Sequence, residues 1–301
     1  MKNKLSTLEI VLEGLMTRYS ERVPDVKKIT RAMVSEGIIS SENEIENDHV
    51  AFRTMGVDHL GVASFEKIFL ALGYQKRDYF YFEAKKLDAF WFAPPEPHFP
   101  RIFVSELRVN DLSETAQKII RSYTNEVKAD PVDQLDLTDG AAIDRFLHQP
   151  LWRTPEWADY ETLLKESEYA AWVIYNRYYL NHYTISVHNL KNGYNTLTEF
   201  NAFLEKNGIR LNDSGGKIKV SPDGGLLQSS TVAEMIAARF ANGDSHTISG
   251  SYVEFAERKV LPEFAHLKPE AIKRQHRREG FETGNADKIF ESTFTSQTSR
   301  D

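Results

Sequence analysis

Residues Asn47–Arg53 have the sequence NDHVAFR, in which a polar pair and a histidine lead directly into an apolar strand. A second stretch of similar order, NHYTISV, occupies residues Asn181–Val187 and alternates polar and apolar side chains as a strand does. Each stretch is followed by a helical pattern that ends near a glycine, Gly73 in the first case and Gly208 in the second. The histidine at 49 precedes its glycine by 24 residues and the histidine at 182 by 26. We therefore predict that the chain contains the same folding unit twice.

The strands expected after each helix support this duplication. Aromatic-rich strands are predicted at 79–82 and 89–92, and their counterparts at 217–220 and 226–229 flank a turn that contains two glycines. The closing strands also resemble each other, with FVSELR at 103–108 and VEFAER at 253–258. The predicted fold class is α+β, built from two β-α-β-β-β units that close around one site.

Helical patterns surround the two predicted units. We predict a single catalytic domain over residues 1–280, followed by a polar tail over 281–301 that is expected to be mobile. Within the domain we expect, in order, a helical lead-in at 1–45, the first unit at 46–110, a helical connector at 111–178, the second unit at 179–260 and a C-terminal helix at 261–280.

Composition excludes several classes of protein. The 301 residues include no cysteine, which rules out disulfides, thiolate metal sites and a cysteine nucleophile. The formal net charge of −7 argues against a nucleic-acid or anionic-membrane partner, because both are bound through clustered Lys and Arg. We recognise no targeting segment and no apolar stretch of membrane-spanning length, and we therefore expect a soluble cytoplasmic protein.

A metal site in this chain must use nitrogen and oxygen ligands. His49 and His182 hold equivalent positions at the start of the two equivalent strands, where both imidazoles would reach the space between the units. The closing strand of the second unit supplies a carboxylate: Glu254 lies on the face opposite Val253, and Glu257 is the competing candidate. Two histidines and one carboxylate are typical of a non-haem Fe(II) site that activates oxygen.

Arg53 lies four residues after His49, so both side chains point to the same face of the strand. A buried guanidinium beside a metal would bind a substrate carboxylate through paired hydrogen bonds. The alternative is that Arg53 pairs with a structural acid such as Asp48 or Glu106. Two further polar residues on strands expected to line the cavity are substrate-binding candidates, Thr184 and Gln228.

These motifs, in this order, resemble the 2-oxoadipate dioxygenase/decarboxylase family, also called hydroxyglutarate synthase, of the vicinal oxygen chelate superfamily. The resemblance rests on NDHVAFR at 47–53, NHYT at 181–184 and GSYVEFAER at 250–258, and it covers roughly residues 5–280. It implies a duplicated β-α-β-β-β architecture around one Fe(II) held by His49, His182 and Glu254, with Arg53 as the catalytic arginine that binds the substrate carboxylate.

The resemblance also implies a reaction. A 2-oxo dicarboxylic acid such as 2-oxoadipate and O₂ would give CO₂ and a 2-hydroxy acid such as 2-hydroxyglutarate, a step of lysine catabolism. Two alternatives remain open at this point: a Zn²⁺- or Mn²⁺-dependent lyase, isomerase or hydrolase on the same scaffold, and a non-catalytic protein that binds a small acid. The sequence does not indicate the oligomeric state.

Overall fold

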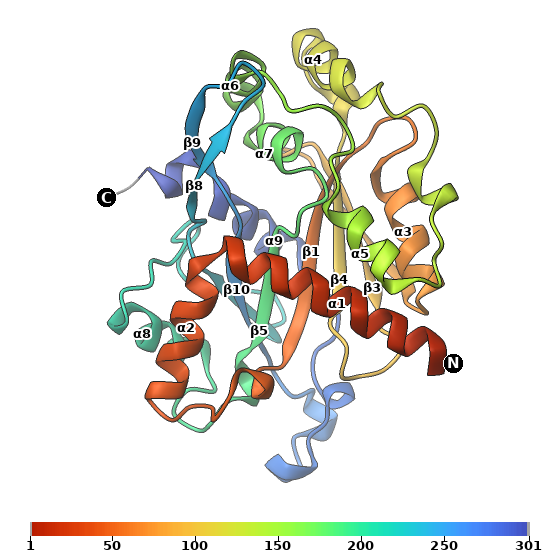
Figure 1. The fold of residues 1–301 in the computed structure, drawn as a ribbon. Coiled ribbons are helices and arrows are strands. Elements are labelled where there is room, and N and C mark those ends of the chain that lie inside the picture. The colour runs from red at the N-terminus through yellow and green to blue at the C-terminus, as the bar shows by residue number, and fades with distance from the viewer. Residues whose placement is uncertain (1, 300–301) are drawn as a thin grey trace.

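One eight-stranded sheet carries both predicted units, in the strand order β2-β3-β4-β1-β5-β10-β7-β6. The computed structural model describes residues 2–299 (Figure 1). The first unit consists of β1 (Asn47–Met55), α3 (Gly61–Ala71), β2 (Gln75–Phe82), β3 (Leu87–Ala93) and β4 (Arg101–Leu107). The second consists of β5 (His182–Ser186), α8 (Leu197–Lys206), β6 (Lys219–Val220), β7 (Leu226–Ser230) and β10 (Tyr252–Arg258).

The two units have the same topology. In each unit the first strand pairs in parallel with the last, β1 with β4 and β5 with β10, and the remaining two strands follow outward in the same order. The first strands of the two units, β1 and β5, pair antiparallel at the centre of the sheet. The predicted α+β fold with a duplicated β-α-β-β-β unit is therefore confirmed.

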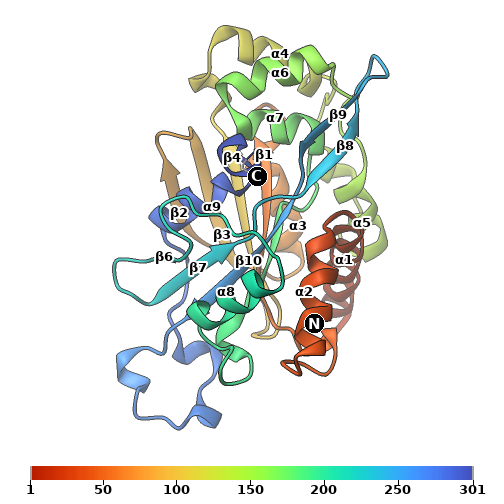
Figure 2. The ribbon, with the colours of Figure 1, turned by 90° about the vertical axis from the view of Figure 1, so that its left-hand side faces the viewer.

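Helices cover one face of this sheet. Phe52 of β1 packs on Phe65 of α3, with ring centroids 4.7 Å apart, and Phe255 of β10 packs on Phe200 of α8 at 5.3 Å. The lead-in forms α1 (Lys2–Arg22), α2 (Pro24–Ser35) and the 3-10 turn η1 (Glu42–Glu44). In Figure 2, α1 and α5 (Gly140–His148) lie on the right and α9 (Thr283–Phe290) on the left of the molecule. The alternation of side chains in the central strands therefore leaves His49 and Glu254 on the face away from these helices.

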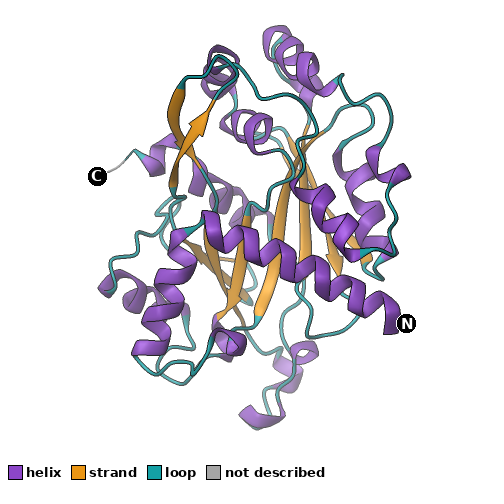
Figure 3. Ribbon diagram, in the orientation of Figure 1, coloured by secondary structure: helices purple, strands orange, loops and turns teal. Residues whose placement is uncertain are grey.

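The connector is helical, as expected from its periodicity. Its helices are α4 (Glu114–Thr124), α5 (Gly140–His148), α6 (Trp157–Glu166) and α7 (Glu168–Asn176), with 3-10 turns η2 (Val109–Asp111) and η3 (Pro131–Gln134). One pair of strands was not predicted. A hairpin of β8 (Met235–Arg239) and β9 (Ser245–Ser249) lies between β7 and β10 in the chain order. It forms its own two-stranded sheet and packs beside α6, as Figure 3 shows in orange.

The predictions for the C-terminus were wrong. Residues 261–280 form no α-helix, because Pro262 and Pro269 interrupt it and leave the 3-10 turns η5 (Pro262–Phe264), η6 (Pro269–Ala271) and η7 (Arg274–His276). The segment expected to be a mobile polar tail forms α9 (Thr283–Phe290), η8 (Glu291–Thr293) and α10 (Thr295–Thr298). No helix among residues 2–299 is long and apolar enough to span a membrane.

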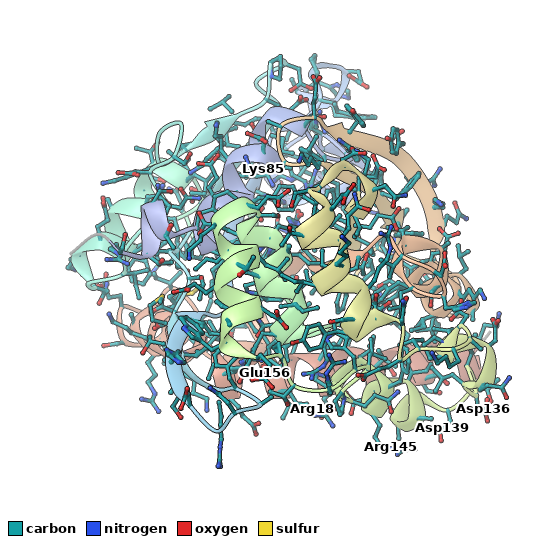
Figure 4. All side chains as sticks on the ribbon, turned by 90° about the horizontal axis from the view of Figure 1, so that it is seen from above. Arg18, Lys85, Asp136, Asp139, Arg145 and Glu156 are labelled. Carbon is teal, nitrogen blue, oxygen red and sulfur yellow. The ribbon has the colours of Figure 1, made fainter. Side chains whose placement is uncertain are left out.

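The tail is ordered because its polar residues find partners on the rest of the chain. Lys85, which lies beside the C-terminal ribbon in Figure 4, forms ion pairs with Asp287 at 2.8 Å and Glu291 at 3.0 Å. Asn212 donates hydrogen bonds to the carbonyl of Lys288 and to the hydroxyl of Ser292. The segment from Phe281 to Thr298, here called the C-terminal cover, thereby closes the face of the sheet that the other helices leave open.

Candidate metal centre

Three side chains from adjacent central strands converge on the face under the C-terminal cover. His49, His182 and Glu254 each offer a ligand atom, and these atoms lie within 4.8 Å of one another. His182 Nε2 is 3.0 Å from one carboxylate oxygen of Glu254, and His49 Nε2 is 3.5 Å from the other. All three residues are buried. The structure therefore brings the predicted ligand set together into one cluster that could hold a metal ion.

The alternation of side chains in β10 decides between the two candidate glutamates. Glu254 shares the cluster face with Tyr252, whereas Val253 lies in the helix-covered core. Glu257 points to the other face, where it accepts a hydrogen bond from the backbone N–H of Leu197 at the start of α8 and pairs with Lys259. Glu257 is thus bound to the end of a helix and takes no part in the cluster.

The charges of the three groups are coupled, because all three lie together in a buried site. Burial lowers the pKa of His182 below its ordinary value, which keeps this imidazole neutral. Burial also opposes the charge on His49, but Glu254 and Asp48 outweigh it and raise the pKa of His49. Burial would raise the pKa of Glu254, yet the two histidines hold that pKa well below its ordinary value. The cluster therefore presents an ionised carboxylate between two imidazoles.

A residue immediately before each histidine orients its ring. Asp48 Oδ1 lies 2.8 Å from His49 Nδ1, and Asn181 Oδ1 lies 3.1 Å from His182 Nδ1. Each imidazole then directs Nε2 into the cluster. Each of the two units thus has a histidine and an oxygen that orients it. The oxygen belongs to a carboxylate in the first unit and to a neutral amide in the second.

Asp48 is held by a buried network of charges. Arg258 donates to both of its oxygens, at 2.7 and 2.9 Å, and Arg101 donates to Oδ2 at 3.2 Å. These two cations outweigh the effect of burial and hold the pKa of Asp48 well below its ordinary value. Arg101 also binds Glu279, which lies in the loop before the C-terminal cover. From the sequence, Asp48 was expected only as a possible partner of Arg53, so its role beside His49 was missed.

We expect Asp48→Asn to lower metal affinity about 10- to 100-fold, because the amide weakens the support of His49 Nδ1. Competition with a metal-binding dye measures the affinity, and circular dichroism checks the fold. Glu279→Gln is the matched control, since it removes a carboxylate from Arg101 without touching His49. An equal loss of affinity in both variants would show that the network acts only through general stability.

Arg53 is buried and held by the C-terminal cover. Its Nη1 donates to the Thr293 hydroxyl at 2.9 Å and its Nη2 donates to the Phe290 carbonyl at 3.0 Å. Neither carboxylate considered in the sequence analysis is its partner, because Asp48 binds Arg258 and Glu106 accepts from the N–H of Val62. Burial lowers the pKa of Arg53.

Aromatic rings surround the guanidinium of Arg53. The rings of Tyr169, Trp172 and Phe290 lie 5.1 to 5.6 Å from its guanidinium carbon. Its Nε has no hydrogen-bond partner among residues 2–299. A buried cation surrounded in this way is costly unless an anion joins it. Arg53 is therefore suited to receive a negatively charged ligand group.

The two other predicted residues contact the cluster itself. The hydroxyl of Thr184, on β5, lies 3.0 Å from His49 Nε2. Gln228, on β7, donates from Nε2 to Glu254 Oε1 at 2.7 Å and accepts from Asn285 of the C-terminal cover at 3.1 Å. Both residues are buried. Gln228 thus links a carboxylate of the cluster to the segment that closes the site.

A small cavity of about 20 Å³ lies at the cluster. Apolar side chains of the C-terminal cover form much of the wall of this cavity. This contribution was not expected from the sequence, because the segment was predicted to be a mobile polar tail. The lining residues are His49, Phe103, His182, Gln228, Tyr252, Glu254, Phe281, Ala286, Ile289 and Phe290. The ring of Phe281 packs edge-on against His49, with centroids 4.8 Å apart. The cluster is therefore shielded from solvent on this side.

Residues 11–269 match the 2-oxoadipate dioxygenase/decarboxylase family. The chain belongs to this family. A chloroplastic 2-oxoadipate dioxygenase/decarboxylase of Arabidopsis thaliana is 44% identical over 301 residues, which cover 96% of this chain and 78% of the relative. A relative of the same description from Oryza sativa subsp. japonica is 42% identical over 306 residues, which cover 98% of this chain and 81% of the relative. The resemblance recognised from the motifs is confirmed.

A solved structure of the 2-oxoadipate dioxygenase/decarboxylase type shares the whole fold. The crystal structure of the hydroxyglutarate synthase in complex with 2-oxoadipate from Oryza sativa matches with a TM-score of 0.90 and 41% identity, covering 100% of this chain and 96% of that one. This match extends over the C-terminal cover as well as the two units. The prediction that the chain is an enzyme is confirmed by its membership of this family.

The comparison with the two plant relatives contradicts the cytoplasmic location that was expected from the sequence. The Arabidopsis member of the 2-oxoadipate dioxygenase/decarboxylase family is described as chloroplastic and the rice member as chloroplastic/amyloplastic. The expectation rested on composition and on the lack of a recognisable leader, and neither property determines the compartment in which a folded domain works.

Proposed function

We propose that this chain is an Fe(II)-dependent dioxygenase/decarboxylase that converts 2-oxoadipate, or a closely similar 2-oxo dicarboxylic acid, and O₂ into CO₂ and 2-hydroxyglutarate. The observation that carries the proposal is the buried cluster of two histidines and one carboxylate in a member of this family. Such a donor set, without thiolate, fits Fe(II) and leaves coordination positions open. The reaction would be a step of lysine catabolism.

His49, His182 and Glu254 would hold the metal. When bound, Fe(II) would supply open coordination positions and pass electrons from the substrate to O₂. Glu254 offers an ionised oxygen to it, and Gln228 orients that carboxylate through its hydrogen bond. Asp48 and Asn181 keep both imidazoles turned toward the ion. These residues therefore fix the position and the charge of the site before substrate arrives.

Arg53 would bind the carboxylate of the substrate farthest from its 2-oxo group. A guanidinium can form two parallel hydrogen bonds with a carboxylate. The apolar side chains of Phe281 and Ile289, which line the cavity at the cluster, would exclude water around the carbon chain. Thr184 would lie beside the reacting end of the substrate, next to His49. Holding both ends of the substrate restricts it to one reactive orientation.

The proposed reaction is balanced without a further reductant. The bond between the carboxylate carbon and the 2-oxo carbon breaks, and that carboxylate leaves as CO₂. One atom of O₂ enters the new carboxylate of the shortened acid, and the other becomes its 2-hydroxyl. The substrate therefore supplies all the electrons, and 2-oxoadipate plus O₂ equals 2-hydroxyglutarate plus CO₂ in every element.

The test is turnover by protein purified without oxygen and loaded with Fe(II). We expect one O₂ consumed and one CO₂ released for each 2-oxoadipate, and incorporation of ¹⁸O from ¹⁸O₂ into both the hydroxyl and the new carboxylate of the product. Protein loaded with Zn²⁺ is the control and should not consume O₂. Turnover by the zinc form without O₂ uptake would instead indicate a lyase, isomerase or hydrolase, and tight binding of 2-oxoadipate without turnover would indicate a binding protein.

A further inference from the structure

A second cavity, of about 420 Å³, lies away from the metal cluster and shares no lining residue with the cavity there. Four separate segments form it: the end of α1, the end of α5 with the loop that leads to α6, the end of α7 with the residues after it, and strand β8 of the inserted hairpin. Figure 2 shows α1, α5 and this hairpin on the same side of the molecule. The hairpin thus builds a wall for which the first unit has no equivalent.

Positive charge lines this cavity. Arg22, Arg177 and Arg239 are among its lining residues, and the lining includes no aspartate or glutamate. Arg22 donates to the amide oxygen of Asn176 and stacks over the ring of Tyr179 at 4.3 Å, and burial lowers its pKa. The chain as a whole has a net charge of −7, but the three arginines give this cavity a local positive charge.

Arg177 shapes the wall rather than supplying a free donor. Its Nε and Nη2 donate to the carbonyl of Trp152 at 3.1 and 2.7 Å, which connects the end of α7 to the loop between α5 and α6. Its backbone has φ of 56°, in the left-handed region that is unfavourable for a bulky residue. Arg22 uses Nη2 for its hydrogen bond to Asn176, so the ligand donors of this cavity are the remaining N–H groups of Arg22 and the guanidinium of Arg239, which lies on an opposite element.

A buried polar atom also lacks a partner in this wall. His148 Nε2 has no hydrogen-bond partner among residues 2–299, while its Nδ1 lies 2.8 Å from the carbonyl of Asp144. Nη1 of Arg18 also lies 3.1 Å from this Nδ1. With the proton on Nδ1, as the carbonyl requires, Nε2 of the neutral ring is a hydrogen-bond acceptor. Buried polar atoms without partners are rare in folded proteins, and this acceptor would be satisfied by a ligand that carries a donor such as a hydroxyl group beside its anionic groups.

We propose that this cavity is a second binding site, which takes a small organic dianion such as a short dicarboxylate or a phosphate monoester. Arg22 and Arg239 neutralise the two charges, and the rings of Tyr175 and Tyr179 contact the body of the ligand. Charge-assisted hydrogen bonds from guanidinium groups are the strongest that side chains offer to carboxylates and phosphates. The site is separate from the proposed oxygenase chemistry and does not depend on it.

The test is calorimetric titration of the metal-loaded protein with glutarate and, separately, with glycerol 3-phosphate. We expect at least one of them to bind saturably at concentrations up to about 10 mM, and at least about tenfold more weakly after the double substitution Arg22→Gln and Arg239→Gln. The two arms distinguish a dicarboxylate ligand from a phosphate ester. Arg145→Gln is the matched control, because Arg145 lies on α5 outside the cavity and is labelled at the edge of Figure 4.

A second variant tests the cavity without removing charge. Ala237 lines the cavity from β8 and is exposed, so Ala237→Trp should fill the space and weaken binding to a similar extent while leaving the core intact. Binding that is equally strong in the wild type, the double variant and Ala237→Trp would place the anion elsewhere, for example at the metal, and would overturn the proposal. So would the lack of saturable binding by either probe.

Discussion

Glu254→Gln is expected to remove the metal and to lower kcat/KM for 2-oxoadipate at least about a thousandfold, or ~4 kcal/mol of transition-state stabilisation. The substitution keeps the shape of the side chain but removes the negative charge that lies between His49 and His182. A neutral amide is a poor ligand for a divalent cation, and the remaining two imidazoles are too few to hold it. Metal content after gel filtration and the rate of O₂ uptake measure the effect.

Glu257→Gln is the matched control for this experiment. It makes the same chemical change three residues further along β10, on the opposite face of the strand, where the carboxylate binds the first N–H of α8. We expect some loss of stability from this variant and full metal content. If Glu257→Gln released the metal and Glu254→Gln retained it, the assignment of the strand faces would be wrong.

Arg53→Ala is expected to keep the metal but to lower kcat/KM for 2-oxoadipate about 100-fold or more, because charge-assisted hydrogen bonds contribute about 1.5–3 kcal/mol each. The reason lies in the position of Arg53, a buried guanidinium whose described partners are a hydroxyl and a carbonyl. Arg53→Lys should recover only part of the activity, since an ammonium group cannot form the paired hydrogen bonds. Steady-state O₂ uptake measures these rates.

A monocarboxylic substrate separates binding from structure in this experiment. Arg53 also ties Phe290 and Thr293 of the C-terminal cover to the sheet, so its loss could loosen the site generally. 2-Oxohexanoate has the same chain length as 2-oxoadipate but lacks the distal carboxylate. We expect Arg53→Ala to abolish the preference for 2-oxoadipate over 2-oxohexanoate. A variant that lost activity equally on both, with the preference unchanged, would show that Arg53 only positions the cover.

Strand periodicity explains why the cluster was predictable. Side chains alternate across a strand, so Glu254 and Val253 had to lie on opposite faces, and the two similar strand openings put His49 and His182 at equivalent positions. These two features can be read from the spacing of residues within one strand and from the similarity of the two units. The hairpin at 235–249 was missed because its strands are short and lie in a segment with no counterpart in the first unit.

The partners of the charged residues could not be predicted in the same way. Asp48 binds Arg258, which lies 210 residues away in the chain, and Arg53 binds Thr293, which lies 240 residues away. A polar tail looks alike in sequence whether it is solvated or buried against a sheet. The paired Lys85 and Asp287 show how the tertiary structure stabilises such a segment.

The sequence by itself determined the duplicated α+β fold, the nitrogen and oxygen chemistry of the site and the face on which each ligand lies. These properties follow from residue type and from spacing within single strands. Only the tertiary structure decided that Asp48 supports His49, that Arg53 is buried with a hydroxyl and a carbonyl as hydrogen-bond partners and that residues 281–298 close the site. Burial and ion pairing depend on which distant segments pack together, and that information is absent from local patterns.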